Sequence, residues 1–230
     1  MKYFCEDAPD YHIIVAGNLL GVAVNRAKFS FPVGKVDMKT MYPMDMEEFM
    51  IAMGEEKLAT QVRQCFETNT AMPSALHDAA MQLYRQYLVV GGMPECVLQF
   101  AQTRDYILIR NTQDTILASY LNDMSKYNNL NEIKKTRLAY DNITVQLSKK
   151  NTRFQYKLIK KGGRASEFEN AIEWLCLSGI VSQVYRIEQI KKPLENYRDI
   201  DAFKIYVSDL GCFALKKIWR RMIFCIWQRN

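Results

Sequence analysis

Two short segments near the start of the chain predict buried β-strands. Residues 11–16 (Tyr-His-Ile-Ile-Val-Ala) form a nearly continuous apolar run that stops at Gly17, and residues 36–41 predict a second strand stopped by Pro43. Continuous apolar runs that end at glycine are typical of strands in a parallel sheet, because such a sheet is buried on both faces. Two strands are too few for a stable parallel sheet, so we expect an incomplete remnant of one.

Helical spacing dominates from residue 45 to residue 127. Asp45 is followed three residues later by Glu48, a capping-box pattern, and the helix that it begins should end at Gly54. The apolar and aromatic side chains of the later helices are best explained as core residues. The further helices are expected at residues 74–90, from Pro94, and at residues 103–127.

The next region changes character. A helix is expected over residues 132–148, then a basic connector, then a helix that begins with a Ser166–Glu169 capping box and ends at Gly179, and then a strand over residues 180–187. Helix, connector, helix and strand in this order are typical of a winged helix-turn-helix. We therefore expect a winged-helix-like region here.

Composition limits the class of protein. The chain has 230 residues, 49% of them hydrophobic and 24% charged, as in ordinary globular proteins. No apolar run is long enough to span a membrane, and the first residues lack the apolar core of a signal peptide. The six cysteines are widely spaced, as expected for free thiols in a reducing compartment. These features predict a cytoplasmic protein without a membrane partner.

Charge is unevenly distributed along the chain. Residues 1–125 carry 10 basic and 15 acidic side chains, whereas residues 126–192 carry 14 basic and 6 acidic ones. The basic region could bind a polyanion such as DNA, or it could be a solvated face. A third possibility is that the helices over residues 74–127 bind a protein partner. The candidate nucleic-acid-binding residues are Lys149, Lys150, Arg153, Lys157, Lys160, Lys161 and Arg164.

No self-sufficient catalytic constellation is present in the sequence. The Gly34-Lys35 pair is followed by Val36, where a phosphate-binding loop needs serine or threonine. Phe29 stands five residues before Gly34, where such a loop needs glycine. The chain has two histidines and no Gly-x-Ser-x-Gly elbow, so we predict no catalytic residue, no metal site and no bound cofactor. Asn18 follows the first expected strand at its carboxyl end, where α/β sheets bind ligands, although the local sequence favours a simple strand cap over a ligand contact.

Five separated phrases nevertheless resemble a known family. Together they resemble the prokaryotic AAA-type ATPases, usually called ATP-binding proteins, that carry a C-terminal domain of unknown function. The resemblance covers residues 1 to about 213, and the phrases occur in the order of the family. They are residues 11–21 (YHIIVAGNLLG), 31–36 (FPVGKV), 42–49 (YPMDMEEF), 87–95 (YLVVGGMPE) and 208–211 (SDLG).

The resemblance implies roles for several residues. Asn18 would occupy the sensor position, where the family more usually has serine. Arg26 would face a neighbouring nucleotide, unless it is an ordinary surface arginine. The Gly91-Gly92-Met93-Pro94 segment would be a tight joint between helices of the lid.

The resemblance also implies that the chain is an internal fragment. The Walker A and Walker B segments would precede Met1, and most of the C-terminal domain would follow Gly211. ATP and Mg²⁺ would then belong to the intact parent, and the partners of this chain would include the missing parts of that parent. The fold class is expected to run from α/β to mainly α. The implied domains are residues 1–72 (end of the ATPase core), 73–128 (helical lid), 129–192 (winged-helix-like domain) and 193–230 (truncated C-terminal domain).

Overall fold

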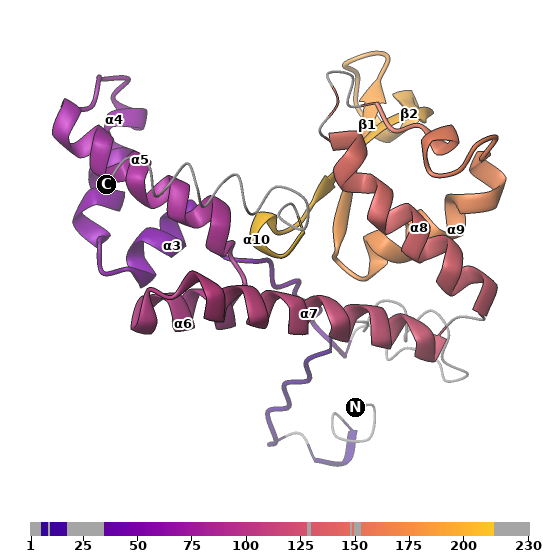
Figure 1. Cartoon of the computed structure of the whole chain (residues 1–230), viewed down its shortest axis with the longest axis horizontal. Helices are drawn as coiled ribbons and strands as arrows, with labels where there is room; N and C mark the ends of the chain where they lie inside the picture. Colours follow the sequence, from indigo (N-terminus) through magenta and orange to yellow (C-terminus); the bar gives the residue numbers. More distant parts are fainter. Residues whose placement is uncertain are drawn as a thin grey trace. The chain divides into compact units, whose positions relative to one another are not determined.

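The computed structural model describes residues 6–8, 10–17, 35–127, 130–147, 149 and 153–213 (Figure 1). The chain divides into two compact units. We call residues 43–133 with 207–230 the helical unit, and residues 1–42 with 134–206 the hairpin unit. The described residues are mostly helical and contain a single two-stranded antiparallel sheet, so the expectation of a mainly α protein is confirmed.

The helical unit is built around an aromatic core. Phe49 and Phe100 are fully buried, with ring centroids 6.4 Å apart. Ile109 and Leu117 of the long helix are buried as well, as expected of core residues, while Tyr106 and Ile116 are partly buried against the core. The helices are α3 (Met46–Ala52), α4 (Glu56–Glu67), α5 (Ser74–Val90), α6 (Pro94–Thr103), α7 (Tyr106–Tyr127) and α10 (Leu210–Phe213).

The predicted capping box at the start of α3 is confirmed. The Asp45 carboxylate accepts the backbone N–H of Glu48 at 2.9 Å, and the Glu48 carboxylate accepts the N–H of Asp45 at 2.9 Å. These bonds satisfy two backbone donors that the first turn of a helix otherwise leaves free.

The hairpin unit follows the predicted order of helix, connector, helix and strand. Its core includes Phe154 and Phe203, whose rings stack at 5.3 Å, and Phe168 of the second helix. The elements are α8 (Leu130–Leu147, in this unit from Lys134), η1 (Tyr156–Leu158), α9 (Ala165–Leu177), β1 (Val181–Ile187), η2 (Leu194–Tyr197) and β2 (Arg198–Val207).

The predicted capping box at the start of α9 is wrong. The helix begins at Ala165, and its N-cap is Arg164, which makes no side-chain capping bond. Ser166 therefore lies inside the first turn, where its hydroxyl cannot cap the helix.

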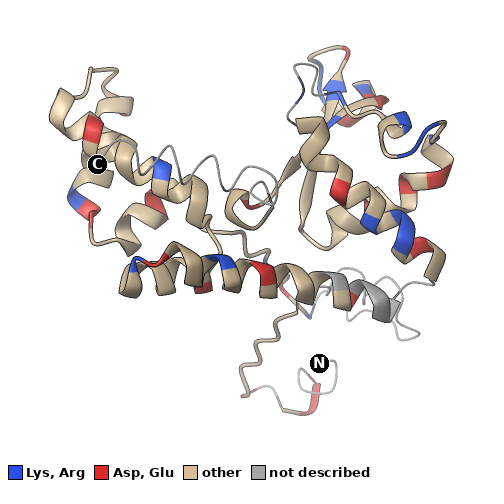
Figure 2. Cartoon of the chain, viewed as in Figure 1, with Lys and Arg blue, Asp and Glu red and all other residues tan. Residues whose placement is uncertain are grey.

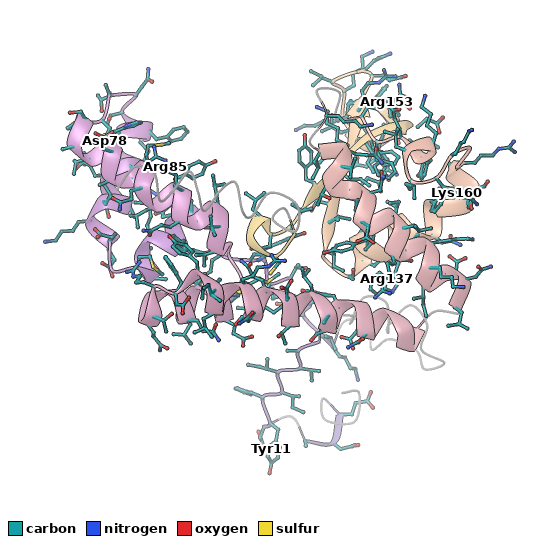
Figure 3. All side chains as sticks on the ribbon, in the orientation of Figure 1. Tyr11, Asp78, Arg85, Arg137, Arg153 and Lys160 are labelled. Carbon is teal, nitrogen blue, oxygen red and sulfur yellow. The ribbon has the colours of Figure 1, made fainter. Side chains whose placement is uncertain are left out.

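The predicted strands over residues 11–16 and 36–41 are also wrong. Neither segment has strand structure, and all of their side chains except the half-buried Val36 are exposed: Ile14 is 97% exposed and Met41 is 93% exposed. Figure 3 labels Tyr11 in the first of these segments. A strand needs a neighbour for its backbone hydrogen bonds, and the described residues supply none here. The expected remnant of a parallel P-loop sheet is thus absent from the described part of the chain.

The two units do not coincide with the four consecutive domains that the sequence implied. In space, residues 207–213 belong with the helices of residues 43–133, whereas residues 193–206 belong with the hairpin. The four-domain division remains a prediction, because family boundaries and compactness are different criteria. None of the described helices is both long enough and apolar enough to cross a lipid bilayer.

Candidate functional site

The most constrained point of the helical unit is the joint between α5 and α6, formed by Gly91 and Gly92. Gly91 ends α5 with φ +77°, a conformation that side chains other than glycine rarely adopt. Gly92 accepts the backbone N–H of Met44 at 2.7 Å. A Cβ atom on Gly92 would lie 2.0 Å from the carbonyl oxygen of Met44, so only glycine fits at this position. The joint therefore depends on close backbone contact.

Asp209 closes this joint from a distant part of the sequence. Its carboxylate is buried, with the residue 3% exposed, and accepts the backbone N–H of Gly92 and that of Cys212, each at 2.6 Å. Burial raises the pKa of Asp209, while the hydrogen bonds from Cys212, Gly92 and Met93 oppose that rise. The carboxylate thus links α10 to the joint through backbone donors that would otherwise be unpaired.

Two further side chains hold the same joint. Gln113 of α7 is 1% exposed, and its Nε2 donates to the carbonyls of Val89 at 2.9 Å and Val90 at 3.0 Å, the last residues of α5. Tyr87 donates its hydroxyl to the carbonyl of Met44 at 2.9 Å, and burial raises its pKa. Every one of these bonds ends on backbone, which indicates a structural joint.

Sequence reasoning missed Gln113 and Asp209. A usable signal existed for Gln113, because it replaces an apolar residue at helical spacing between Ile109 and Leu117. Asp209 lies in residues 208–211, which carry part of the family resemblance, but its contact with Gly92 had no local signal because the two residues are 117 positions apart in the sequence.

The chemistry at this joint does not favour catalysis. The thiols of Cys96 and Cys212 are completely buried, and their hydrogen bond, followed by burial, raises the pKa of Cys212. A protonated, buried thiol is a poor nucleophile. Within the described residues, no group of three or more His, Cys, Asp or Glu side chains could hold a metal ion.

The predicted nucleotide contacts cannot be placed, because Asn18 and Arg26 lie outside the described residues. Lys150 of the predicted nucleic-acid-binding set lies outside them as well. The other members of that set are described and exposed: Lys149, Arg153, Lys157, Lys160, Lys161 and Arg164. Five of the seven predicted residues lie in the continuous segment 153–164, which we call the basic turn.

Side chains of α8 hold the backbone of the basic turn. Asn142 donates its Nδ2 to the carbonyl of Leu158 at 2.8 Å. Gln146, which is 4% exposed, accepts the N–H of Gln155 at 2.7 Å and donates to the Gln155 carbonyl at 3.2 Å. The turn therefore has a fixed backbone and exposed cationic side chains. Figure 2 shows the basic residues of this turn beside the acidic residues of α9.

Two basic side chains of the turn make contacts within the hairpin unit. Lys160 lies 3.0 Å from the carboxylate of Glu167, an exposed ion pair. Arg153 donates to the carbonyl of Asp201 at 3.2 Å. Both side chains are labelled in Figure 3. Neither contact buries the charge of the turn.

Comparison with known proteins gives a match to one family model. No curated protein and no solved structure matches the chain. A family model described as "Domain of unknown function (DUF8612)" matches residues 81–218, more than half of the chain, including both Gly92 and Asp209. The chain therefore belongs to the DUF8612 family.

Proposed function

We propose that this chain is a non-catalytic part of an AAA-type ATP-binding protein, comprising a helical lid and a winged-helix-like domain. The observation that carries the proposal is the joint between α5 and α6. Three of the five phrases that resemble the ATPase family meet there, through Met44, Gly92 and Asp209. These phrases begin 45 and 121 residues apart in the sequence, yet one set of hydrogen bonds joins them.

The hydrogen bonds at the joint explain why these segments of the sequence need the residues that they have. Gly92 must be glycine because of Met44, and Asp209 must be acidic to accept the N–H groups of Gly92 and Cys212. A lid that moves as one body over a nucleotide needs such a fixed angle between its helices. The order α8, η1, α9, β1 and β2 supports a winged-helix-like domain after the lid.

The chain itself should neither bind nor hydrolyse ATP. Its 230 residues contain no Gly-x-x-x-x-Gly-Lys-Ser/Thr loop to hold the phosphates of ATP. The phosphate-binding groups, with ATP and Mg²⁺, would come from a nucleotide-binding module that acts as the protein partner. Asn18 and Arg26 are the residues proposed to face that nucleotide, and we place the assembly in the cytoplasm.

The DNA that flanks the reading frame tests the first half of the proposal. We expect a translated upstream segment with a phosphate-binding loop and an acidic strand. Flanking frames that encode no such segment, in a genome that also lacks it as a separate neighbouring gene, would contradict the ATPase proposal.

Nucleotide titration tests the second half. A fluorescent ATP analogue with Mg²⁺ should show no saturable binding to the purified chain up to about 1 mM, the range of weak ligands. Phosphate release from ATP should equal that of a buffer blank. Saturable binding that disappears in the Asn18→Ala variant, but persists in a control Asp78→Ala variant, would show that the chain binds nucleotide by itself.

A further inference from the structure

We propose that the basic turn binds the phosphodiester backbone of double-stranded nucleic acid while α9 stays out of the groove. Binding would therefore be independent of base sequence. The proposal depends on the hairpin unit alone, so it stands or fails separately from the proposed ATPase origin.

The first argument is local charge. Residues 149–164 contain seven basic residues and no acidic ones. Within the described part of the chain, no carboxylate pairs with Lys157, Lys161 or Arg164. Lys160 has Glu167 as its partner, but an exposed ion pair is weak and can be replaced by a phosphate. The turn thus offers several cations to one polyanion.

The second argument is the fixed backbone of the turn. Asn142 and Gln146 bind its carbonyl and N–H groups from α8. At Gly163 a Cβ atom would lie 2.7 Å from the Tyr156 carbonyl, so this end of the turn is closely packed. A turn that is already ordered loses little backbone freedom when it binds a ligand.

The third argument concerns α9, the helix that would read bases in a typical winged helix. Its inner face, including Phe168 and Leu175, is buried. Its exposed face carries Glu169, Asn170 and Glu173. Two carboxylates on this face would be repelled by the phosphates that line a groove. Contacts are therefore expected from the turn to phosphates, which position a protein without reading sequence.

The fourth argument favours nucleic acid over an anionic membrane. Basic segments that bind lipid surfaces usually insert large apolar side chains beside their cations. In the basic turn the large apolar side chains are covered instead: Phe154 is 7% exposed, and Leu158 and Ile159 are half-buried. The turn has charge for a phosphate backbone but lacks an apolar surface for a bilayer.

Fluorescence anisotropy of the full chain tests the proposal. Labelled duplexes of about 20 base pairs, in two unrelated sequences, should bind equally with micromolar affinity at about 50 mM salt, and binding should weaken steeply as salt rises. The triple variant Lys157→Glu/Lys161→Glu/Arg164→Glu should lose at least about tenfold in affinity. A duplex RNA of the same length shows whether the backbone of DNA or of RNA is preferred, and tight binding of either supports the proposal.

Two control variants sharpen the test. Lys191→Glu/Lys192→Glu changes exposed charges elsewhere in the hairpin unit and should alter affinity by less than about threefold. Glu169→Gln/Glu173→Gln should create no preference between the two sequences. The proposal is overturned by absence of a complex at about 100 μM protein, by full binding of the triple variant, or by a clear sequence preference. Binding to phosphatidylserine vesicles in place of the duplexes would also overturn it.

Discussion

The α5–α6 joint and the basic turn are both held by hydrogen bonds from side chains to backbone, but they place their charged groups in opposite directions. In both, polar side chains that are buried or half-buried form hydrogen bonds to the backbone: Gln113 and Asp209 at the joint, Asn142 and Gln146 at the turn. At the joint the carboxylate of Asp209 points inward, and both of its oxygen atoms accept hydrogen bonds from backbone N–H groups. At the turn the charged groups point outward to solvent.

This difference shows how structural residues can be separated from functional ones by their hydrogen-bond partners. A buried charge whose oxygen atoms are all bonded to backbone has no capacity left for a ligand. Exposed charges on a fixed turn keep that capacity. Accordingly, changes at the joint should affect stability, and changes at the turn should affect binding.

The largest effect should come from Gly92→Ala. The new Cβ would lie 2.0 Å from the Met44 carbonyl oxygen, so backbone has to move apart, at an expected cost of about 3 kcal/mol or more. Urea unfolding followed by circular dichroism measures this loss, and the variant is expected to lose the cooperative transition of the helical unit.

A matched control is Gly54→Ala. Gly54 has a positive φ, +83°, which Gly92 does not have, but nothing lies within 4 Å of the Cβ position of Gly54. The Gly54→Ala variant should lose only about 1 kcal/mol of unfolding free energy, from backbone strain alone. Equal losses at Gly92 and Gly54 would contradict the close contact with Met44.

Asp209→Ala should have the next largest effect. It leaves the N–H groups of Gly92 and Cys212 buried without an acceptor, and each orphaned group costs roughly 1–3 kcal/mol. In this variant the amide hydrogen of Gly92 should exchange with solvent far faster than in the unchanged chain. The exposed Asp78→Ala serves as control, and an unchanged Gly92 exchange rate in Asp209→Ala would disprove the contact.

The pH dependence of this effect has a definite sign. Burial raises the pKa of Asp209 in the folded state above its value in the unfolded chain. The folded protein then binds a proton more readily, so the contribution of Asp209 to stability is greatest below the unfolded pKa and declines as pH rises through the folded pKa. The stability advantage of the unchanged chain over Asp209→Asn should therefore shrink as pH rises above the pKa that the carboxyl group has in the unfolded chain. An advantage that grows over this range would mean that the backbone donors outweigh burial.

The smallest effect on stability should come from the triple charge reversal at Lys157, Lys161 and Arg164. These side chains are exposed and have no acidic partner within the described residues, so their replacement should leave the urea midpoint unchanged. A large drop in the midpoint would show that the turn is part of the folding core, and the comparison between joint and turn would fail.

Local features of the sequence predicted much of the secondary structure. The start of α3 followed from the pairing of Asp45 with Glu48, and the end of α5 from Gly91. The long helix was expected from residue 103 but begins at Tyr106, because α6 runs to Thr103 and Arg104 then adopts a positive φ. Such signals work because capping and glycine conformation act over a few residues.

Features that depend on distant contacts could not be predicted in this way. The apolar run at residues 11–16 has the composition of a buried strand, but composition does not say whether a partner strand exists. Asp209 looks like an ordinary turn residue until Gly92 is found beside it. The described members of the basic set are exposed, but their binding of nucleic acid stays a prediction, as do the roles of Asn18 and Arg26.

The order in which the chain is made gives the joint a further consequence. The helical unit consists of residues 43–133 and 207–230, so the whole of the segment 134–206 emerges from the ribosome between its two pieces. The hydrogen bond from the Gly92 N–H to the Asp209 carboxylate therefore cannot form until 117 more residues have been synthesised. During translation, therefore, the hairpin unit can fold before the older helices are complete, and the nascent helices are the part most exposed to chaperones and proteases.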